Sequence, residues 1–220
     1  MKKILLFIIL FLAVGGVGWY VWRDKGASWQ EKSVVAGDLP ELPLAPVVDA
    51  PQDLKSRAMA IIARPILVKN ELSVSAKENA IAKLKEIAEL IKQDYNTIYP
   101  WFDLGAYRKL IGDYDGAIEA WNFAITAWPK DFVAYHNLGG LYGFTLKNYP
   151  KSEEYFLKSI EVNPGNISGY LELADLYEYA YAAKADQAEV ILLKGLENNP
   201  GEANLTTALS SYRERHNKAQ

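Results

Sequence analysis

A pattern of small, aromatic and proline residues repeats through the second half of the chain. The first copy consists of Trp101, Leu104, Gly105, Tyr114, Ala117, Trp121, Ala124 and Pro129. The second consists of Tyr135, Leu138, Gly139, Tyr149, Ser152, Phe156, Ser159 and Pro164, and the third of Tyr170, Leu173, Ala174, Ala188, Leu192, Gly195 and Pro200. Because the terminal prolines lie 35 and 36 residues apart, we expect units of about 34 residues with one or two residues inserted in the turn.

Each unit of this pattern predicts two antiparallel helices. Leu104 and Gly105 are slim enough to let the second helix approach closely opposite Ala124, while tryptophans fill the space beside them. The stretch GDYDG, residues 112–116, joins the two helices, and a proline ends the second because it cannot continue the hydrogen-bond ladder. One hairpin cannot bury its apolar face alone, so successive units must stack into an all-α solenoid.

The pattern resembles the tetratricopeptide repeat (TPR) family over residues 98–202. The resemblance implies three repeats, at residues 98–131, 132–166 and 167–202. A helical period before them, at residues 53–97, predicts an irregular helical hairpin that forms a degenerate first repeat. Residues 203–220 predict a C-terminal capping helix of the kind that solenoids require.

The two flanking segments carry their own local signals. In the first hairpin, Pro65 breaks or kinks the first helix. Ser73 is a weak start signal for the second helix, and Ser75 with Glu78 makes a better capping box. The apolar stripe of that second helix consists of Ala80, Leu84, Ile87, Leu90 and Ile91. The polar outer face of the capping helix consists of Arg213, Glu214, Arg215 and His216.

Residues 4–22, ILLFIILFLAVGGVGWYVW, form a run of 19 residues without a charge. At about 1.5 Å per residue such a helix can just cross a hydrocarbon core of about 30 Å. The aromatic end of the run and Arg23 favour a transmembrane signal anchor at residues 1–25, with the N-terminus cytoplasmic and the repeats outside the cytoplasm. The alternative is a signal peptide cleaved near Gly16 or Gly18, which would leave a secreted protein.

Residues 26–52 predict an extended, proline-rich spacer between the anchor and the helices. Pro40, Pro43, Pro46 and Pro51 interrupt this stretch, which has no helical period. One interpretation is a solvated tether. The other is that LPELPLAPVV, residues 39–48, docks as a peptide in the protein's own groove or on a partner domain.

The sequence gives little support for catalysis. Cysteine is absent, which excludes disulfides, thiolate zinc sites, a cysteine nucleophile and a lipoprotein anchor. The two histidines, His136 and His216, are far apart, and the acidic residues of the GDYDG turn lack the glutamate that completes a calcium loop. With a net charge of −3, no strongly basic surface for nucleic acid is expected. We expect no enzymatic activity, no metal or cofactor and no small-molecule substrate.

The resemblance to the TPR family implies a peptide-binding groove lined by the first helix of each repeat. Its positions in the first repeat are Tyr99, Phe102, Ala106, Lys109 and Leu110. Those in the second are Val133, His136, Asn137, Gly140, Gly143 and Phe144, and those in the third are Ser168, Leu171, Glu172, Asp175, Glu178 and Tyr179. Core packing is the alternative role for each aromatic residue among them.

Charge predicts which partner the groove prefers. Some TPR proteins hold a terminal carboxylate with lysines, asparagines and an arginine, but only Asn137 matches that set here. Residues 167–202 contain seven acidic residues and two lysines, so a neutral or basic partner is expected. Two functions follow: a membrane-anchored interaction scaffold for envelope assembly, secretion or a membrane complex, or a permanent structural subunit of a larger assembly without an exchangeable peptide.

Overall fold

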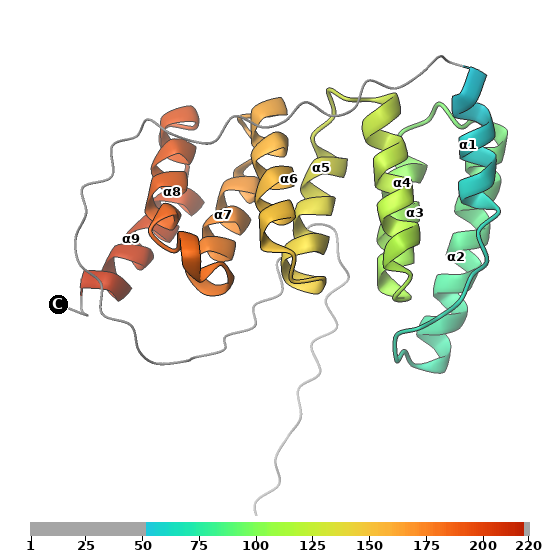
Figure 1. Ribbon diagram of the computed structural model, residues 1–220, viewed down its shortest axis with the longest axis horizontal. Coiled ribbons are helices and arrows are strands. Elements are labelled where there is room, and N and C mark those ends of the chain that lie inside the picture. Colours follow the sequence, from blue (N-terminus) through green and yellow to red (C-terminus); the bar gives the residue numbers. More distant parts are fainter. Residues whose placement is uncertain (1–51, 218–220) are drawn as a thin grey trace, which may run out of the picture. The chain divides into compact units, whose positions relative to one another are not determined.

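The computed structural model describes residues 52–217, which form helices and short connections without a strand (Figure 1). The α-helices are α1 (Gln52–Ile62), α2 (Val74–Gln93), α3 (Tyr99–Leu110), α4 (Tyr114–Ala127), α5 (Val133–Gly140), α6 (Tyr149–Val162), α7 (Ile167–Asp175), α8 (Gln187–Asn198) and α9 (Ala203–Asn217). Two π-helical segments, η1 (Leu141–Thr145) and η2 (Leu176–Ala180), extend α5 and α7, and a short 3₁₀ helix, η3 (Ala182–Lys184), follows. From α1 to α9 each α-helix packs against the next one along the chain, as stacked hairpins require.

The α3–α4 hairpin has the close helix contact that its small residues predict. A Cβ atom on Gly105 would overlap the indole ring of Trp121 on α4. That indole donates a hydrogen bond from Nε1 to the carbonyl of Phe102 at 3.2 Å. Gly105 therefore sets how near the two helices lie, and the indole both fills the contact and satisfies its own N–H.

The turn between α3 and α4 depends on two residues with special backbone roles. Gly112 has a φ of +80°, a conformation that glycine adopts without steric cost. Asp113 then caps α4, because its carboxylate accepts a hydrogen bond from the amide of Gly116 at 3.3 Å. The GDYDG motif is thus a helix-to-helix turn.

The segment that connects α1 to α2, residues 63–73, is fastened to this same turn. The amides of Lys69 and Asn70 both donate to the carbonyl of Ile111, at 2.7 and 3.1 Å. Arg108 donates to the carbonyls of Arg64 and Pro65, each at 2.7 Å. These bonds join the degenerate first hairpin to the first full repeat.

A buried ion-pair cluster completes that junction. The side chain of Arg108 is 3% exposed and lies 2.9 Å from the Asp113 carboxylate, which Arg64 also contacts at 3.0 Å. Burial acts to raise the pKa of Asp113, but the hydrogen bonds from Arg64 and Gly116 and the charges of the two arginines outweigh it and lower that pKa below its usual value. The Asp113 carboxylate is therefore charged when it caps α4.

The extra residue of the second repeat lies at the end of its first helix, not in the turn. Residues 111–113 connect α3 to α4, and residues 146–148 connect η1 to α6, so the two turns are equally long. The bond from the amide of Leu146 to the carbonyl of Leu141, 2.9 Å long, spans five residues, and this wider ladder accommodates one more residue. The predicted insertion in the turn is wrong here, although η3 does lengthen the corresponding connection of the third repeat.

Two local predictions for the first hairpin are also wrong. Ser73, rather than Ser75, caps α2, since its hydroxyl accepts a hydrogen bond from the amide of Ala76 at 3.2 Å. Leu90 is 46% exposed and so lies off the stripe, whose other four members are buried. Helix α1 packs on both α2 and α4, and Pro65 lies beyond its end at Ile62.

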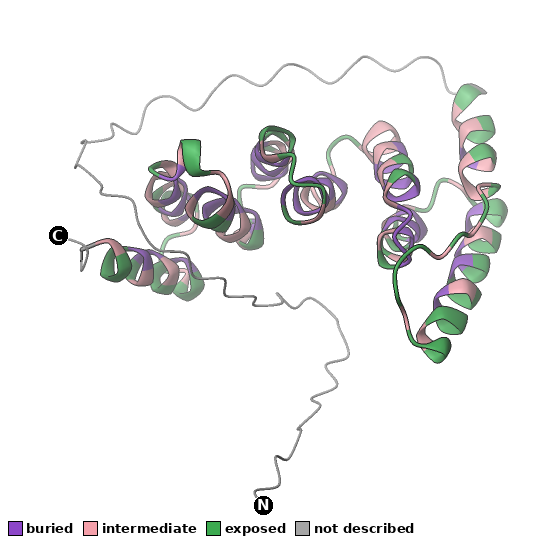
Figure 2. Ribbon diagram, turned by 60° about the horizontal axis from the view of Figure 1, so that its bottom comes forward, coloured by how far each residue is buried: buried purple, intermediate pink, exposed green. Residues whose placement is uncertain are grey.

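Buried residues occur on the helices throughout the described region (Figure 2), and their apolar side chains form two clusters. The first extends from Ala58 on α1 to Tyr142 on η1, and the second from Phe156 on α6 to Tyr212 on α9. In the first cluster the rings of Trp101 and Phe123 stack with centroids 3.8 Å apart. Each cluster contains residues of more than one hairpin, so the hairpins bury their apolar faces against one another.

The predicted anchor at residues 1–25 lies outside the described residues. So does the predicted spacer at residues 26–52, except for Gln52, which begins α1. Between residues 52 and 217, no helix has the length and apolar character needed to cross a bilayer.

Candidate functional site

The first helices of the three repeats, α3, α5 with η1, and α7 with η2, carry the residues predicted to line the groove. Leu110, Phe144 and Tyr179 occupy equivalent positions near the ends of these helices, 34 and 35 residues apart. Although large and apolar, they are 45%, 42% and 63% exposed. Equivalent positions of stacked repeats face the same side, so we call these three residues the apolar row.

A polar centre lies on the same helices and joins all three repeats. The carboxylate of Glu172 on α7 lies 3.4 Å from Nε2 of His136 on α5 and also passes over Gly140. Burial lowers the pKa of Lys109 on α3, and the negative charge of Glu172 opposes that shift. Lys109, His136 and Glu172, which come from three different repeats, are called the polar centre.

The ring of His136 is held from its other side by the third repeat's helix cap. Nδ2 of Asn166 lies 3.5 Å from Nδ1 of His136 and donates to the Ser159 hydroxyl at 2.7 Å. The other amide atom of Asn166 accepts from the amide of Gly169 and so caps α7. Since Phe156 meets the imidazole edge-on at 5.6 Å, the position of His136 is fixed by packing as well as by polar contacts.

Two of the three acidic side chains at the third-repeat end of the groove, Glu178 and Glu172, contact Arg215 and His136 of the same chain. Arg215 on α9 donates two hydrogen bonds of 2.8 Å to the carboxylate of Glu178 and lies 5.8 Å from the centre of the Tyr179 ring. Burial raises the pKa of Asp175 to about 6, with the negative charges of Glu178 and Glu172 acting in the same direction and Arg215 against them. Glu178 and Glu172, two of the three acidic residues predicted to line the groove, therefore already have partners within the chain.

The same contacts extend the prediction for the capping helix. Its arginines are exposed, as a polar outer face requires, but Arg213 also donates to Glu189 on α8 at 2.6 Å and Arg215 reaches η2. The guanidinium of Arg215 is the groove residue that sequence reasoning missed. The sequence did contain a clue to Arg215. The third repeat is strongly acidic, and basic residues are expected on the helix that packs against it.

The remaining predicted groove residues divide into exposed and packed positions. Tyr99 is exposed and meets the half-buried ring of Phe102 edge-on at 6.3 Å. Phe102 packs against the first core cluster and Leu171 against the second. Gly143 is buried against Ser152 and Leu176 rather than open to the groove. The other positions are the exposed Ala106 and Ser168 and the half-buried Val133 and Asn137.

The described residues hold no group of three or more His, Asp or Glu side chains suited to a metal ion. What the site offers chemically is a surface of apolar and ionic contacts. Within the polar centre Glu172 contacts His136, while the apolar row has apolar surface left in solvent.

Comparison with known proteins supports the TPR resemblance. No protein-family model matches the chain. Human tetratricopeptide repeat protein 12 (Homo sapiens) is 32% identical over 117 residues, which are 52% of this chain and 16% of that protein, so the chain spans about a sixth of its relative. The crystal structure of MamA is similar over 68% of this chain and 90% of that one, with a TM-score of 0.52 and 18% identity. At that identity the likeness concerns the fold alone: the described part of the chain is a TPR-like helical solenoid. Neither comparison supports the predicted membrane anchor.

Proposed function

We propose that this chain is a protein–protein interaction scaffold that binds a segment of a partner protein in the groove formed by α3, α5–η1 and α7–η2. The observation that carries the proposal is the apolar row. Large apolar side chains scattered singly over a surface need no explanation, but exposed ones that recur at one position of successive repeats lie along the same side of the solenoid, which is typical of an interaction surface. Leu110, Phe144 and Tyr179 would supply the anchoring contacts of the complex.

The polar centre supports a role in positioning the partner. Glu172 already contacts His136 and lies near enough to Lys109 to influence its charge electrostatically. These three residues offer hydrogen bonds to the backbone or side chains of a bound segment. The partner chemistry proposed is therefore a segment with apolar side chains for the row and a neutral or basic flank beside Asp175.

The location of the scaffold is a further part of the proposal. Residues 4–22 would anchor it as a single-pass membrane protein with the groove outside the cytoplasm, serving envelope assembly, secretion or a membrane complex. The uncharged length of that run and its aromatic end support an uncleaved anchor. N-terminal sequencing of the mature protein tests this, and a first residue near Trp19 would instead mean cleavage and secretion.

The groove itself is tested by affinity capture from detergent-solubilised membranes with matched variants. One variant carries serine at Leu110, Phe144 and Tyr179, and its control carries Leu193→Ser, which removes a 44% exposed leucine from α8, a second helix of its hairpin. The proposal expects partners captured by the native chain and the control to be lost with the groove variant. Loss with Leu193→Ser alone would favour the permanent structural subunit.

Partner charge is tested separately with Asp175→Lys. Among the three acidic groove residues, Asp175 is the suitable choice because Glu178 pairs with Arg215 and Glu172 contacts His136, and replacing either would remove a contact within the fold. Recovery of a partner with a basic flank should fall, and its dependence on salt should weaken. Unchanged recovery at both low and high salt would contradict the charge preference while leaving the groove proposal standing.

A further inference from the structure

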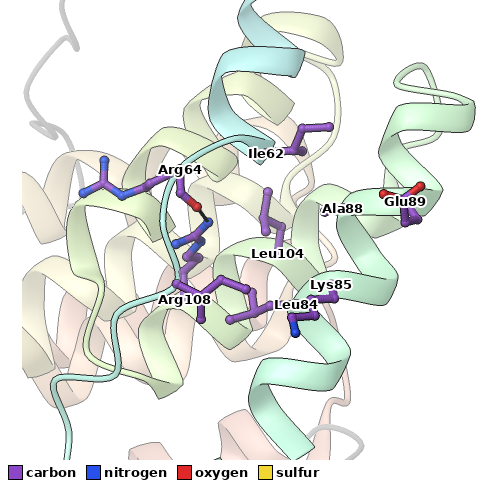
Figure 3. Close-up of a pocket in the computed structure, with 9 residues that line it drawn as sticks. Ile62, Arg64, Leu84, Lys85, Ala88, Glu89, Leu104 and Arg108 are labelled. Carbon is purple, nitrogen blue, oxygen red and sulfur yellow. Dashed lines mark hydrogen bonds between the residues drawn. The ribbon is translucent and has the colours of Figure 1, made fainter.

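A second concave surface, lined by none of the groove residues, lies among α1, α2, α3 and the segment that connects α1 to α2. It is a pocket of about 300 Å³ whose apolar wall consists of Ile62, Ile66, Leu84, Ala88 and Leu104 (Figure 3). Its volume is at the lower end of the range for ligand pockets. An apolar pocket of this size implies an apolar occupant.

Most charged residues around the pocket already have partners within the chain, so an ionic ligand is not needed to neutralise them. Arg108 and Arg64 also line it, but both guanidinium groups bind Asp113, and Arg108 binds two backbone carbonyls as well. Glu89 lies 3.7 Å from Lys92. The exposed Lys85 is then the cation at the rim that is available to an acidic neighbour.

We propose that the occupant of this pocket is the chain's own segment 42–48, LPLAPVV. The segment precedes α1 by only a few residues, and the pocket lies at the other end of that helix, beside Ile62. Helix α1 has 11 residues, so it is about 16 Å long at about 1.5 Å per residue. An extended chain covers that distance in about five residues at about 3.3 Å each, so a chain running back from Gln52 reaches the pocket near Val47 and passes it near Leu44.

The chemistry of the segment fits the pocket. Leu42, Leu44, Val47 and Val48 provide apolar side chains. Pro43 and Pro46 favour an extended conformation without internal hydrogen bonds, which lowers the entropy lost on docking. The carboxylates that flank it, at Glu41 and Asp49, have the sign that suits Lys85.

The absence of cysteine makes a cross-linking test clean, because every thiol is one that has been introduced. In the full chain in detergent, Val47→Cys is combined with Ala88→Cys on the pocket wall. The matched control combines Val47→Cys with Leu90→Cys, two residues along α2, exposed and turned about 200° from Ala88. Both pairs share the same tether, and in an undocked chain the more exposed Leu90→Cys would be the easier of the two to reach.

Under mild oxidation the Val47–Ala88 pair should form an intramolecular disulfide about tenfold or more faster than the control pair. Leu44→Cys with Ala88→Cys should behave in the same way. Equal rates for the pocket and control pairs would overturn the proposal. So would cross-linking of Ala88→Cys mainly between two molecules, which would make a second copy of the chain the occupant.

A second measurement does not depend on disulfide geometry. Val47→Asp in the full chain should increase hydrogen exchange of amides around Ile66 and Ala88, while Val35→Asp, farther from α1, should leave it unchanged. Identical exchange in both variants would count against docking. Neither experiment touches the groove, so the outcome is independent of the proposed function.

Discussion

Arg215 on α9 and Glu178 on η2 form a two-pronged ion pair, with Nε and Nη2 of the arginine each 2.8 Å from a carboxylate oxygen. The side chain of Glu178 is 8% exposed. A bidentate pair with one buried member has a fixed geometry that an exposed pair lacks. The C-terminal helix α9 therefore supplies the positive charge that neutralises Glu178 at the end of the third repeat's first helix. It also contributes apolar side chains to the second core cluster.

Arg215→Gln should lower the free energy of unfolding by about 1–3 kcal/mol, because it leaves the buried carboxylate of Glu178 without its cation. The control is Arg213→Gln, which removes the more exposed pair with Glu189 and should cost at most about 1 kcal/mol. Urea unfolding measures both. Adding Glu178→Gln to Arg215→Gln should restore part of the loss, and the absence of such coupling would show that the pair does not stabilise the fold.

Asp175→Asn should raise the melting temperature at pH 7.5 and have little effect at pH 4. Burial raises the pKa of Asp175 to about 6 from a usual value of 3.8. The folded state therefore holds this proton more tightly than the unfolded state, and the ionised carboxylate costs stability as the pH rises from about 4 through 6. Although neighbouring protein atoms desolvate the carboxylate, Asp175 as a whole is exposed to solvent, so the gain should be well below the full value of the pKa shift.

Melting curves recorded between pH 4 and 8 check this prediction for Asp175. Glu197→Gln, an exposed carboxylate on α8 of the same repeat, controls for the change in net charge. A variant whose advantage grew toward low pH would have the wrong sign and would rule out a raised pKa at Asp175.

Gly105→Leu should be destabilising by about 1–3 kcal/mol or more, as overpacked cores are. Its first side-chain atom would already overlap the rigid indole of Trp121, which has no flexible end to move aside. Ala106→Leu, one residue along and exposed, should change stability by about 0.5 kcal/mol or less. Thermal unfolding compares the two, and similar melting temperatures would show that the repeat register is misplaced.

Asp113→Asn should cost about 3 kcal/mol, near the lower end for breaking a buried ion pair. Asparagine can still cap α4, so the loss isolates the charge that Arg108 and Arg64 require. The control is Asp115→Asn in the same turn, whose side chain is 77% exposed and 3.9 Å from Arg64. Chemical denaturation should show a small effect for the control, and equal losses would contradict the buried cluster.

The hairpins could be predicted from the sequence because their signals are local and repeated. Gly105 and Trp121 meet as their spacing indicated, and each proline lies just beyond a second helix. The position of the extra residue in the second repeat had no such signal. A turn and the last turn of a helix can both take one more residue, and the choice depends on packing between repeats, such as that of Gly143 against Leu176.

The electrostatics of the site were harder to predict, since the partners are distant in sequence. Glu178 and Arg215 are 37 residues apart, and Glu172 meets His136 on another repeat. The contacts of Arg108 could have been anticipated from the sequence. Arg108 occupies the position that Tyr142 and Tyr177 hold in the next two repeats. An arginine at a buried aromatic position requires a buried acceptor, and the turn's Asp113 with the carbonyls of residues 64 and 65 provides it.

The π-helical segments η1 and η2, at the ends of α5 and α7, are places where the chain can gain or lose a residue without disturbing the rest of the solenoid. A residue gained or lost within η1 changes the pitch of a single turn, so α6 and everything after it keep their rotational phase. The same change in the middle of α6 would rotate all later side chains of that helix by about 100° and turn Phe156 out of its cluster. Phe144 and Tyr179 lie within η1 and η2. A change of length there can therefore alter the direction of these two groove side chains while the packing of the other helices stays the same.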